Sequence, residues 1–167
     1  LDLAVANGNI RYEENQVYAN SGGQLVQVWL SLEDEDSRSV AWGDWDNDGD
    51  FDLAVANQGA TSALPDRIYT NQGGVLSPTW ATPSNRLTTA LAWGDLQGDG
   101  RLELATGEIK GSPRSRLYAT RAGAFVEDWI SPQSEDAVDL AWGDVDGDGD
   151  PDLAYGKLGE PGIIYRN

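Results

Sequence analysis

Short runs of apolar and aromatic residues alternate along the chain with turns rich in Gly, Asn, Asp and Pro. No run keeps the 3.6-residue period of an amphipathic helix, and short runs bounded by turn residues are typical of β-strands. The pattern predicts about 14 strands, at residues 2–7, 15–20, 25–30, 38–43, 52–57, 66–71, 76–81, 88–93, 102–107, 115–120, 126–131, 138–143, 152–156 and 162–166.

The runs belong to an internal repeat. The segment Ala41-Trp42-Gly43-Asp44 returns at residues 92–95 and again at 141–144, so the unit is about 50 residues long. Four strands in a unit of this length are typical of a β-propeller blade. We therefore predict an all-β fold: a β-propeller segment of four-stranded antiparallel blades in a single domain over residues 1–167. The predicted repeats are approximately 1–37 (partial), 38–87, 88–137 and 138–167 (partial).

The strands of each unit are called A to D; in the second repeat they are residues 38–43, 52–57, 66–71 and 76–81. The first repeat supplies only B, C and D, and the last only A, B and C. Between three and four blades are too few to close a ring. We expect the segment to be part of a larger propeller, or to be completed by self-association.

The connection from strand A to strand B carries the most specific chemistry. In the second and fourth repeats it has Asp at positions 1, 3, 5, 7 and 9 and Gly at position 6. Alternating oxygen ligands converge on one Ca²⁺ in such loops, and Gly permits the sharp turn. The predicted ligands are Asp44, Asp46, Asp48, Asp50 and Asp52 in one loop, and Asp144, Asp146, Asp148, Asp150 and Asp152 in the other, with positions 50 and 150 acting through the backbone carbonyl.

These loops differ from an EF-hand, which needs a bidentate Glu at position 12 and flanking helices. Position 12 here is Val55 or Tyr155, inside a predicted strand. The competing interpretation is a set of solvated acidic turns, since Asp-Gly pairs are common in turns. The four carboxylate ligands within nine residues, at positions 1, 3, 5 and 9, repel one another without a cation, which favours the Ca²⁺ interpretation.

The third repeat departs from this pattern. Its loop has fewer carboxylates, and the candidate ligands are Asp95, Gln97, Asp99, the backbone carbonyl of Arg101, and Glu103. We expect weaker calcium binding there, or none.

The loop Asp-x-Asp-x-Asp-Gly-x-x-Asp-Leu at 44–53 and 144–153, with the Trp-Gly-Asp at its start, resembles the FG-GAP/VCBS repeat. That family builds the β-propeller of integrin α subunits and of many secreted bacterial proteins. The resemblance covers essentially the whole chain, although Ala-Asn-Gln-Gly at 56–59 stands where the family has Gly-Ala-Pro. It implies structural calcium and an extracellular adhesion or ligand-binding module, secreted or at the cell surface.

The composition of the chain argues against several other classes of protein function. The chain has 28 acidic and 11 basic residues, a net charge of −17, and no Cys, His or Met. Such a charge argues against nucleic-acid binding, and the missing residue types exclude disulfides, thiol catalysis and histidine metal sites. No apolar run is long enough for membrane insertion. The acids that could act as a catalytic pair are mostly assigned to calcium, and no spacing singles out another pair, so we do not expect an enzyme.

Antiparallel strands place the A–B and C–D loops on one face of a propeller, and the B–C and D–A loops on the other. The B–C loops vary most in length and sequence between repeats. Loops on a rigid scaffold often carry recognition, so this second face is the candidate surface for a protein or glycan partner; drift in loops without a role would look the same. The acidic run 33–36, in a D–A loop, is expected to be solvated, and a cation or a basic partner is the alternative.

Six of the seven Trp residues occupy two repeating positions, which indicates packing between blades; Trp45, inside a calcium loop, is the exception. Packing roles make the Trp residues poor support for a lectin. Three functional hypotheses remain open. They are a structural, adhesion or ligand-binding module, a lectin-like propeller or an accessory propeller attached to a secreted enzyme, and a self-assembling filament or surface-layer subunit.

Overall fold

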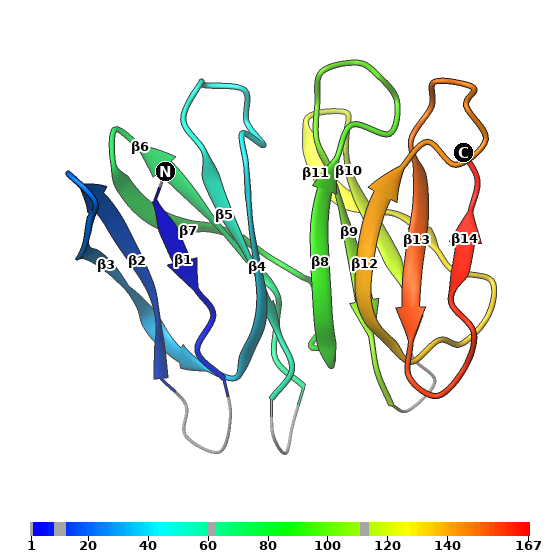
Figure 1. Ribbon diagram of the computed structural model, residues 1–167, viewed down its shortest axis with the longest axis horizontal. Coiled ribbons are helices and arrows are strands. Elements are labelled where there is room, and N and C mark those ends of the chain that lie inside the picture. The colour runs from blue at the N-terminus through cyan, green and yellow to red at the C-terminus, as the bar shows by residue number, and fades with distance from the viewer. Residues whose placement is uncertain (1, 9–12, 60–62, 111–113) are drawn as a thin grey trace.

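The computed structural model describes residues 2–8, 13–59, 63–110 and 114–167. Within these ranges the chain forms fourteen strands and no helix (Figure 1). The strands are β1 (Leu3–Val5), β2 (Glu13–Ser21), β3 (Gln24–Glu35), β4 (Ser37–Gly43), β5 (Asp52–Asn57), β6 (Arg67–Gln72), β7 (Val75–Ala81), β8 (Thr88–Gly94), β9 (Glu103–Glu108), β10 (Arg116–Arg121), β11 (Ala124–Ile130), β12 (Ala137–Gly143), β13 (Asp152–Lys157) and β14 (Ile163–Tyr165).

The strands form four antiparallel sheets in chain order: β1-β2-β3, β4-β5-β6-β7, β8-β9-β10-β11 and β12-β13-β14. The outer two sheets have three strands and the inner two have four. The predicted all-β fold is confirmed, and the sheets are consistent with propeller blades. The assignment to a single domain, the repeat boundaries and the completion of a ring stay predictions.

The acidic run at 33–36 is not a solvated loop. Strand β3 continues to Glu35, beyond the predicted end at residue 30, because it pairs with β2 as far as Glu13, which lies opposite Glu35. Glu35 and Asp36 are buried. The Glu35 carboxylate accepts hydrogen bonds from Arg67 Nη2 at 2.7 Å and Nε at 2.9 Å. The sequence interpretation was wrong here because the partner of the acid lies in a distant strand.

Repeating aromatic pairs hold neighbouring sheets together. A Trp from the outermost strand of one sheet meets a Tyr of the next sheet edge-on, with ring centroids about 5 Å apart, in the pairs Trp29–Tyr69, Trp80–Tyr118 and Trp129–Tyr165. Edge-to-face pairs at this separation add to the stabilisation by apolar burial. The predicted packing role of these residues is confirmed.

The innermost strands approach closely, β4 against β8 and β8 against β12. Gly43 permits the first approach: a Cβ on it would lie 2.6 Å from the ring of Trp93. Gly94 permits the second, with the Trp142 ring 2.6 Å from such a Cβ. Each of these two indoles also donates to the preceding sheet, Trp93 to Ala41 O at 3.3 Å and Trp142 to Ala92 O at 3.4 Å.

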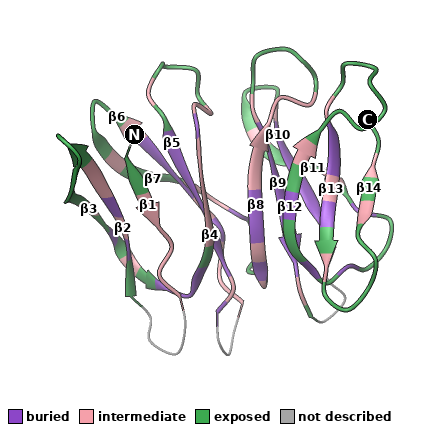
Figure 2. Cartoon of the chain, in the orientation of Figure 1, coloured by how far each residue is buried: buried purple, intermediate pink, exposed green. Residues whose placement is uncertain are grey.

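Burial is greatest in the middle of the molecule (Figure 2). Strands β5 and β9 are buried along their whole length, whereas β1 and β14 contain no fully buried residue. In the described ranges no helix is long and apolar enough to cross a membrane.

Candidate metal centres

The three A–B loops share one backbone frame, at the upper edge of the molecule in Figure 1. The carboxylate at position 1 accepts two backbone N–H groups in each loop. Asp44 accepts from Asp48 and Gly49, Asp95 from Asp99 and Gly100, and Asp144 from Gly147 and Gly149, over 2.6 to 3.1 Å. The acid at position 5 accepts from the amide two residues later in every loop.

Positions 4 and 6 of each loop adopt a left-handed backbone. Asn47 and Gly49 have φ of 60° and 95°, and Gly147 and Gly149 have 80° and 99°. L-residues with side chains rarely adopt this region, and Asn tolerates it better than most. These two positions allow the chain to turn sharply within the loop.

Position 9 fastens the loop to the sheet. Asp52 is fully buried and accepts hydrogen bonds from Trp45 N at 3.0 Å and Asn71 N at 2.8 Å. Asp152 does the same with Val145 N at 2.9 Å and Asn167 N at 3.0 Å. One carboxylate thus links the start of the loop to the end of the third strand of its sheet.

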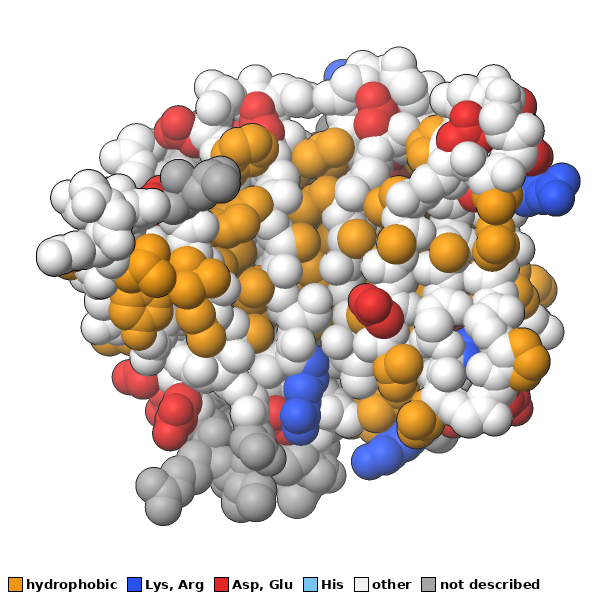
Figure 3. Space-filling view, in the orientation of Figure 1, with side chains coloured by type: hydrophobic (Ala, Val, Ile, Leu, Met, Phe, Trp, Pro, Cys, Tyr) orange, Lys and Arg blue, Asp and Glu red, His pale blue; other side chains and the backbone are white. Residues whose placement is uncertain are grey.

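Two groups of three carboxylates come together. Asp44, Asp46 and Asp48 each place a carboxylate oxygen within 4.8 Å of the others. Asp144, Asp146 and Asp152 do the same in the fourth sheet. These groups could each hold a metal ion, and in Figure 3 acidic side chains stand along this edge.

The remaining predicted ligands lie outside the two triads. Asp52 lies in the same loop as the first triad but is not a member of it, and Asp148 stands in the same relation to the second triad. The Asp50 carboxylate turns away and accepts from Gly73 N at 2.9 Å, which leaves its backbone carbonyl for the predicted role. The predicted contribution of the Asp150 carbonyl stays a prediction.

The electrostatics of the first group favour a cation. Desolvation, then the charges of Asp48 and Asp44, raise the pKa of Asp46. Desolvation also raises the pKa of Asp52, with the charges of Asp46 and Asp48 adding to it and two backbone hydrogen bonds opposing it. A bound cation would reverse these repulsions.

The third loop has the same frame but no such group: among the described residues, Asp95, Asp99 and Glu103 do not form a triad. An arginine lies beside this loop, as Arg166 lies beside the fourth loop, with its Nη1 3.4 Å from Asp146. Arg121 donates from Nη1 to Gln97 Oε1 at 3.3 Å and from Nε to Asp128 at 2.8 Å.

The remaining groups of this loop serve its backbone. Glu103 is buried and accepts from Leu96 N at 2.7 Å, while the Arg101 amide donates to Asp99. Weak or absent calcium binding at 95–103 stays a prediction. Sequence reasoning missed Arg121; the available signal was its place in the repeat, where the second repeat has Gln72.

The B–C and D–A segments share the opposite edge. Backbone hydrogen bonds join them at the same place in three sheets: Gln58 N to Asp36 O, Ile109 N to Leu87 O, and Leu158 N to Asp136 O, at 2.8 to 3.0 Å. Parts of the candidate partner loops, residues 9–12, 60–62 and 111–113, lie outside the described residues.

Asp66, on this edge, is fully buried, and sequence reasoning did not single it out. It accepts from Asn57 N at 3.0 Å and Thr88 Oγ1 at 2.9 Å. Desolvation nonetheless raises its pKa to about 7.

Comparison with known families gives one match. Residues 1–55 match the FG-GAP-like repeat, which confirms the resemblance over that range. The matched range contains the first sheet, strand β4 and the whole of the first acidic loop. A search of curated proteins found no match.

Proposed function

We propose, from the FG-GAP-like repeat over residues 1–55 and the two aspartate triads, that this chain is a calcium-stabilised extracellular β-propeller module. It acts as a structural, adhesion or ligand-binding unit, secreted or at the cell surface. The observation that carries the proposal is the convergence of Asp44, Asp46 and Asp48, repeated by Asp144, Asp146 and Asp152 on an equivalent backbone frame.

Ca²⁺ fits these loops better than other metals. The triads offer only carboxylate oxygens, and the chain has no His or Cys for softer metals. Ca²⁺ takes six to eight oxygens in flexible geometry, which backbone carbonyls and water would complete, whereas Mg²⁺ demands near-ideal octahedral geometry. Extracellular modules bind Ca²⁺ with modest affinity, which suits the millimolar calcium outside cells.

The partner surface is the edge opposite the calcium loops. The B–C and D–A segments meet there, joined by backbone hydrogen bonds in three of the four sheets. Because their sequences differ from repeat to repeat, this edge offers different contacts at each sheet for a protein or glycan. The calcium loops would hold the other edge rigid.

The test is a thermal melt of the chain in millimolar Ca²⁺ and in excess EDTA, with Mg²⁺ as comparison. With Ca²⁺ at about ten times a Kd of about 10⁻⁴ M, each site that binds only the folded state adds about 1.4 kcal/mol of stability. Two such sites add about 2.8 kcal/mol, which is roughly 5–10 °C for a chain of this size. We expect a rise of this order with Ca²⁺ that equal Mg²⁺ does not reproduce.

Two matched variants localise the effect. Asp48→Asn removes a charge from the first triad, and Asp99→Asn makes the same change in the third loop. Both Asp residues accept the amide two positions later at 2.9 Å, and Asn can keep that hydrogen bond. We expect Asp48→Asn to lose about half of the calcium-dependent rise and Asp99→Asn to keep it. No rise in the parent chain, or equal losses in both variants, would contradict the proposal.

A further inference from the structure

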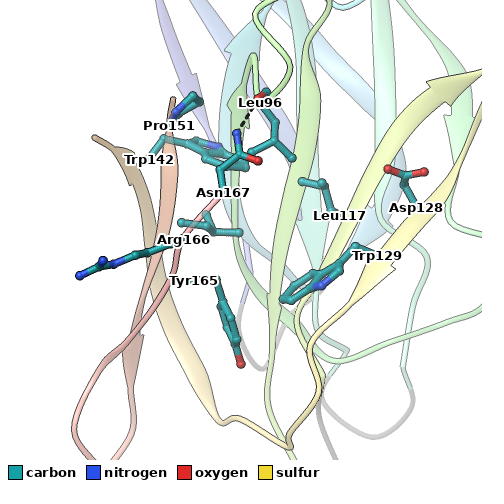
Figure 4. Close-up of a pocket in the computed structure, with 10 residues that line it drawn as sticks. Leu96, Leu117, Asp128, Trp129, Trp142, Pro151, Tyr165, Arg166 and Asn167 are labelled. Carbon is teal, nitrogen blue, oxygen red and sulfur yellow. Dashed lines mark hydrogen bonds between the residues drawn. The ribbon is translucent and has the colours of Figure 1, made fainter. Parts of the chain in front are cut away.

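The three interfaces between successive sheets, numbered in chain order, have similar apolar parts. A Trp of the outermost strand meets a Tyr of the next sheet in each of them, and Figure 4 shows the last of these pairs, Trp129 and Tyr165. In the second interface Phe125 also packs against Trp80 and Trp93, with ring centroids 5.1 and 6.2 Å apart. Because the Trp–Tyr pairs recur, they do not determine which sheet packs on which, and arrays of repeats are prone to misassembly.

Three positions of the repeat set the charge of each interface. One position precedes strand A and belongs to the sheet before the interface; it holds Glu35, Arg86 and Glu135 in the three interfaces. The other two belong to the following sheet, at the end of strand B (Asn57, Glu108, Lys157) and at the start of strand C (Arg67, Arg116, Ile163). Unlike the aromatic pairs, these residues change from one interface to the next.

In the first interface the preceding sheet supplies the anion. The buried Glu35 carboxylate accepts from Arg67 Nη2 at 2.7 Å and from Asn57 Nδ2 at 2.6 Å. Both donors belong to the second sheet, so a carboxylate of one sheet is neutralised by the next.

The second interface has the opposite polarity. Arg86, from the second sheet, has Nε 3.6 Å from Glu108 and Nη2 3.4 Å from Glu127, and both acids belong to the third sheet. Arg116, also of the third sheet, pairs with the same two acids, through Nε to Glu127 at 2.8 Å and through Nη1 to Glu108. Glu108 and Arg116 are buried. Here the preceding sheet supplies the cation, and the following sheet has one more acid than base.

The third interface returns to the polarity of the first. Glu135 is buried and accepts from the Tyr165 hydroxyl of the fourth sheet. Lys157 stands in the fourth sheet where Glu108 stands in the third. A hydrogen bond with Glu160 is the main cause that raises the pKa of Lys157, and the charge of Glu135 adds to it. The anion again comes from the preceding sheet and the cation from the following one.

Glu108 opposes the carboxylates of the other two interfaces. If the first sheet packed on the third, Glu35 would meet Glu108 in place of Asn57. If the third sheet packed on the third sheet of a second copy, Glu135 would meet the same acid. Like charges in a buried contact are costly, because they are removed from water without a partner.

Arg86 is excluded from other sheets in the same way. On the fourth sheet it would meet Lys157, and on the second sheet of another copy it would meet Arg67. Of the four described sheets, only the third has a carboxylate at the end of strand B.

We propose that the reversed charges of Arg86 and Glu108 fix the order of the sheets, so that the second sheet packs on the third and on no other. Specificity of this kind comes from the unfavourable pairings as much as from the favourable one. The pair includes no predicted calcium ligand, so the proposal stands or falls independently of the calcium proposal.

The experiment gives the second interface the charges of the first. The double variant Arg86→Glu/Glu108→Asn leaves Arg116 in place, so that a carboxylate, an amide and a guanidinium occupy the three positions, as in the first interface. The single variant Arg86→Glu instead sets a carboxylate beside Glu108 and Glu127. We expect the single variant to melt at least about 3 °C below the parent chain and the double variant to regain most of that loss.

The second measurement concerns the order of the sheets. Each chain is unfolded in urea and refolded at several chain concentrations and one calcium concentration. Size-exclusion chromatography then measures the share that returns to its original elution volume. We expect the double variant, whose first and second interfaces carry the same charges, to leave a several-fold larger misassembled share than the parent chain.

The variant Arg86→Lys/Glu108→Asp is the matched control, because it changes the same two residues and keeps their signs. It should refold as completely as the parent chain even if it melts at a lower temperature.

Four results would overturn the proposal. They are a single variant as stable as the parent chain, a double variant that regains no stability, a double variant that refolds as completely as the parent, and a control that misassembles as much as the double variant. The first two would show that the signs of the charges do not govern packing, and the last two that they do not govern order.

Discussion

At the scale of single residues, the acid that ends each A–B loop has a structural task independent of any cation. Asp52 and Asp152 each accept two backbone N–H groups from different strands or loops of their sheet. Glu103, one methylene longer, accepts from Leu96 N. Metal ligation and loop anchoring therefore overlap in one residue type, and a mutation at position 9 would disturb both.

Asp66 predicts a pH dependence of stability. Its pKa is raised from 3.8 to about 7 in the folded chain, mainly by desolvation, so the folded state favours the protonated form. The stability that this proton contributes is complete below the unfolded pKa and is lost as pH rises through about 7. Each unit of pKa difference corresponds to about 1.4 kcal/mol.

Asp66→Asn should remove this dependence. Asn15 occupies the equivalent position in the first sheet and accepts Asn7 N at 2.9 Å, as Asp66 accepts Asn57 N. We expect the free energy of urea unfolding of the parent chain, relative to this variant, to fall between about pH 4 and pH 7. A difference that is constant across this range, or that grows with pH, would contradict the raised pKa.

Sequence reasoning reached some residues and missed others, for a physical reason. The two triads could be predicted because the members of each lie in a single nine-residue loop with a recognisable spacing. Glu35, Arg121 and Phe125 were missed because their roles depend on partners in other strands or sheets. Contacts between sheets follow from the packing of repeats, which spacing along the chain does not reveal.

At the scale of elements, the glycine in the repeated Trp-Gly-Asp sets how closely adjacent sheets approach. Gly94 lies under the Trp142 ring, whereas nothing lies within 4 Å of a Cβ built on Gly143. Gly94→Ala should therefore lower the free energy of unfolding by about 1–3 kcal/mol, the usual cost of overpacking.

Gly143→Ala is the matched control, because it makes the same change in the same motif. It should alter stability by no more than about 0.5 kcal/mol, as substitutions at open surface positions do. Chemical denaturation of both variants measures the difference. Equal losses of stability in the two variants would mean that the backbone conformation of the glycine, and not its contact with Trp142, explains the effect.

Strand positions were largely predictable at this scale. Short apolar runs bounded by turn residues recur in each repeat, so each repeat supported the assignment of the others. The exceptions are strand ends: β3 runs to Glu35 and β1 is only three residues long. The end of β3 and the length of β1 depend on the strands with which they pair, and these strands cannot be identified from the sequence of one strand alone.

At the scale of the whole molecule, the main contacts between sheets in the described residues join neighbours in the chain. Stability in such arrays is a sum over units and the interfaces between them, so the terminal sheets, with one interface each, open most easily. Hydrogen exchange should be slowest in β5 and β9, which are buried throughout, and faster in β1 and β14. Uniform protection of all four sheets would show a single cooperative unit instead.

The fold class followed from the repeat length and the four strands per unit. The sequence did not predict how a ring is completed, because several kinds of sheet could pack on the free faces of the first and last sheets. Exposed Leu25, Val26 and Leu30 on β3 and Ile164 on β14 are residues that a further sheet would cover.

The position of Arg121 affects how the negative charge of each A–B loop is neutralised. Its guanidinium is part of the chain, so it reaches the third loop at fixed stoichiometry as soon as β10 and β11 pair. In the fourth loop, Arg166 Nη1 lies 3.4 Å from an Asp146 carboxylate oxygen, so that loop also has a countercharge within the chain. Under the calcium proposal, the loop of the second sheet receives its countercharge only where the ion is abundant. The loop of the second sheet would then depend most on the calcium concentration around the protein.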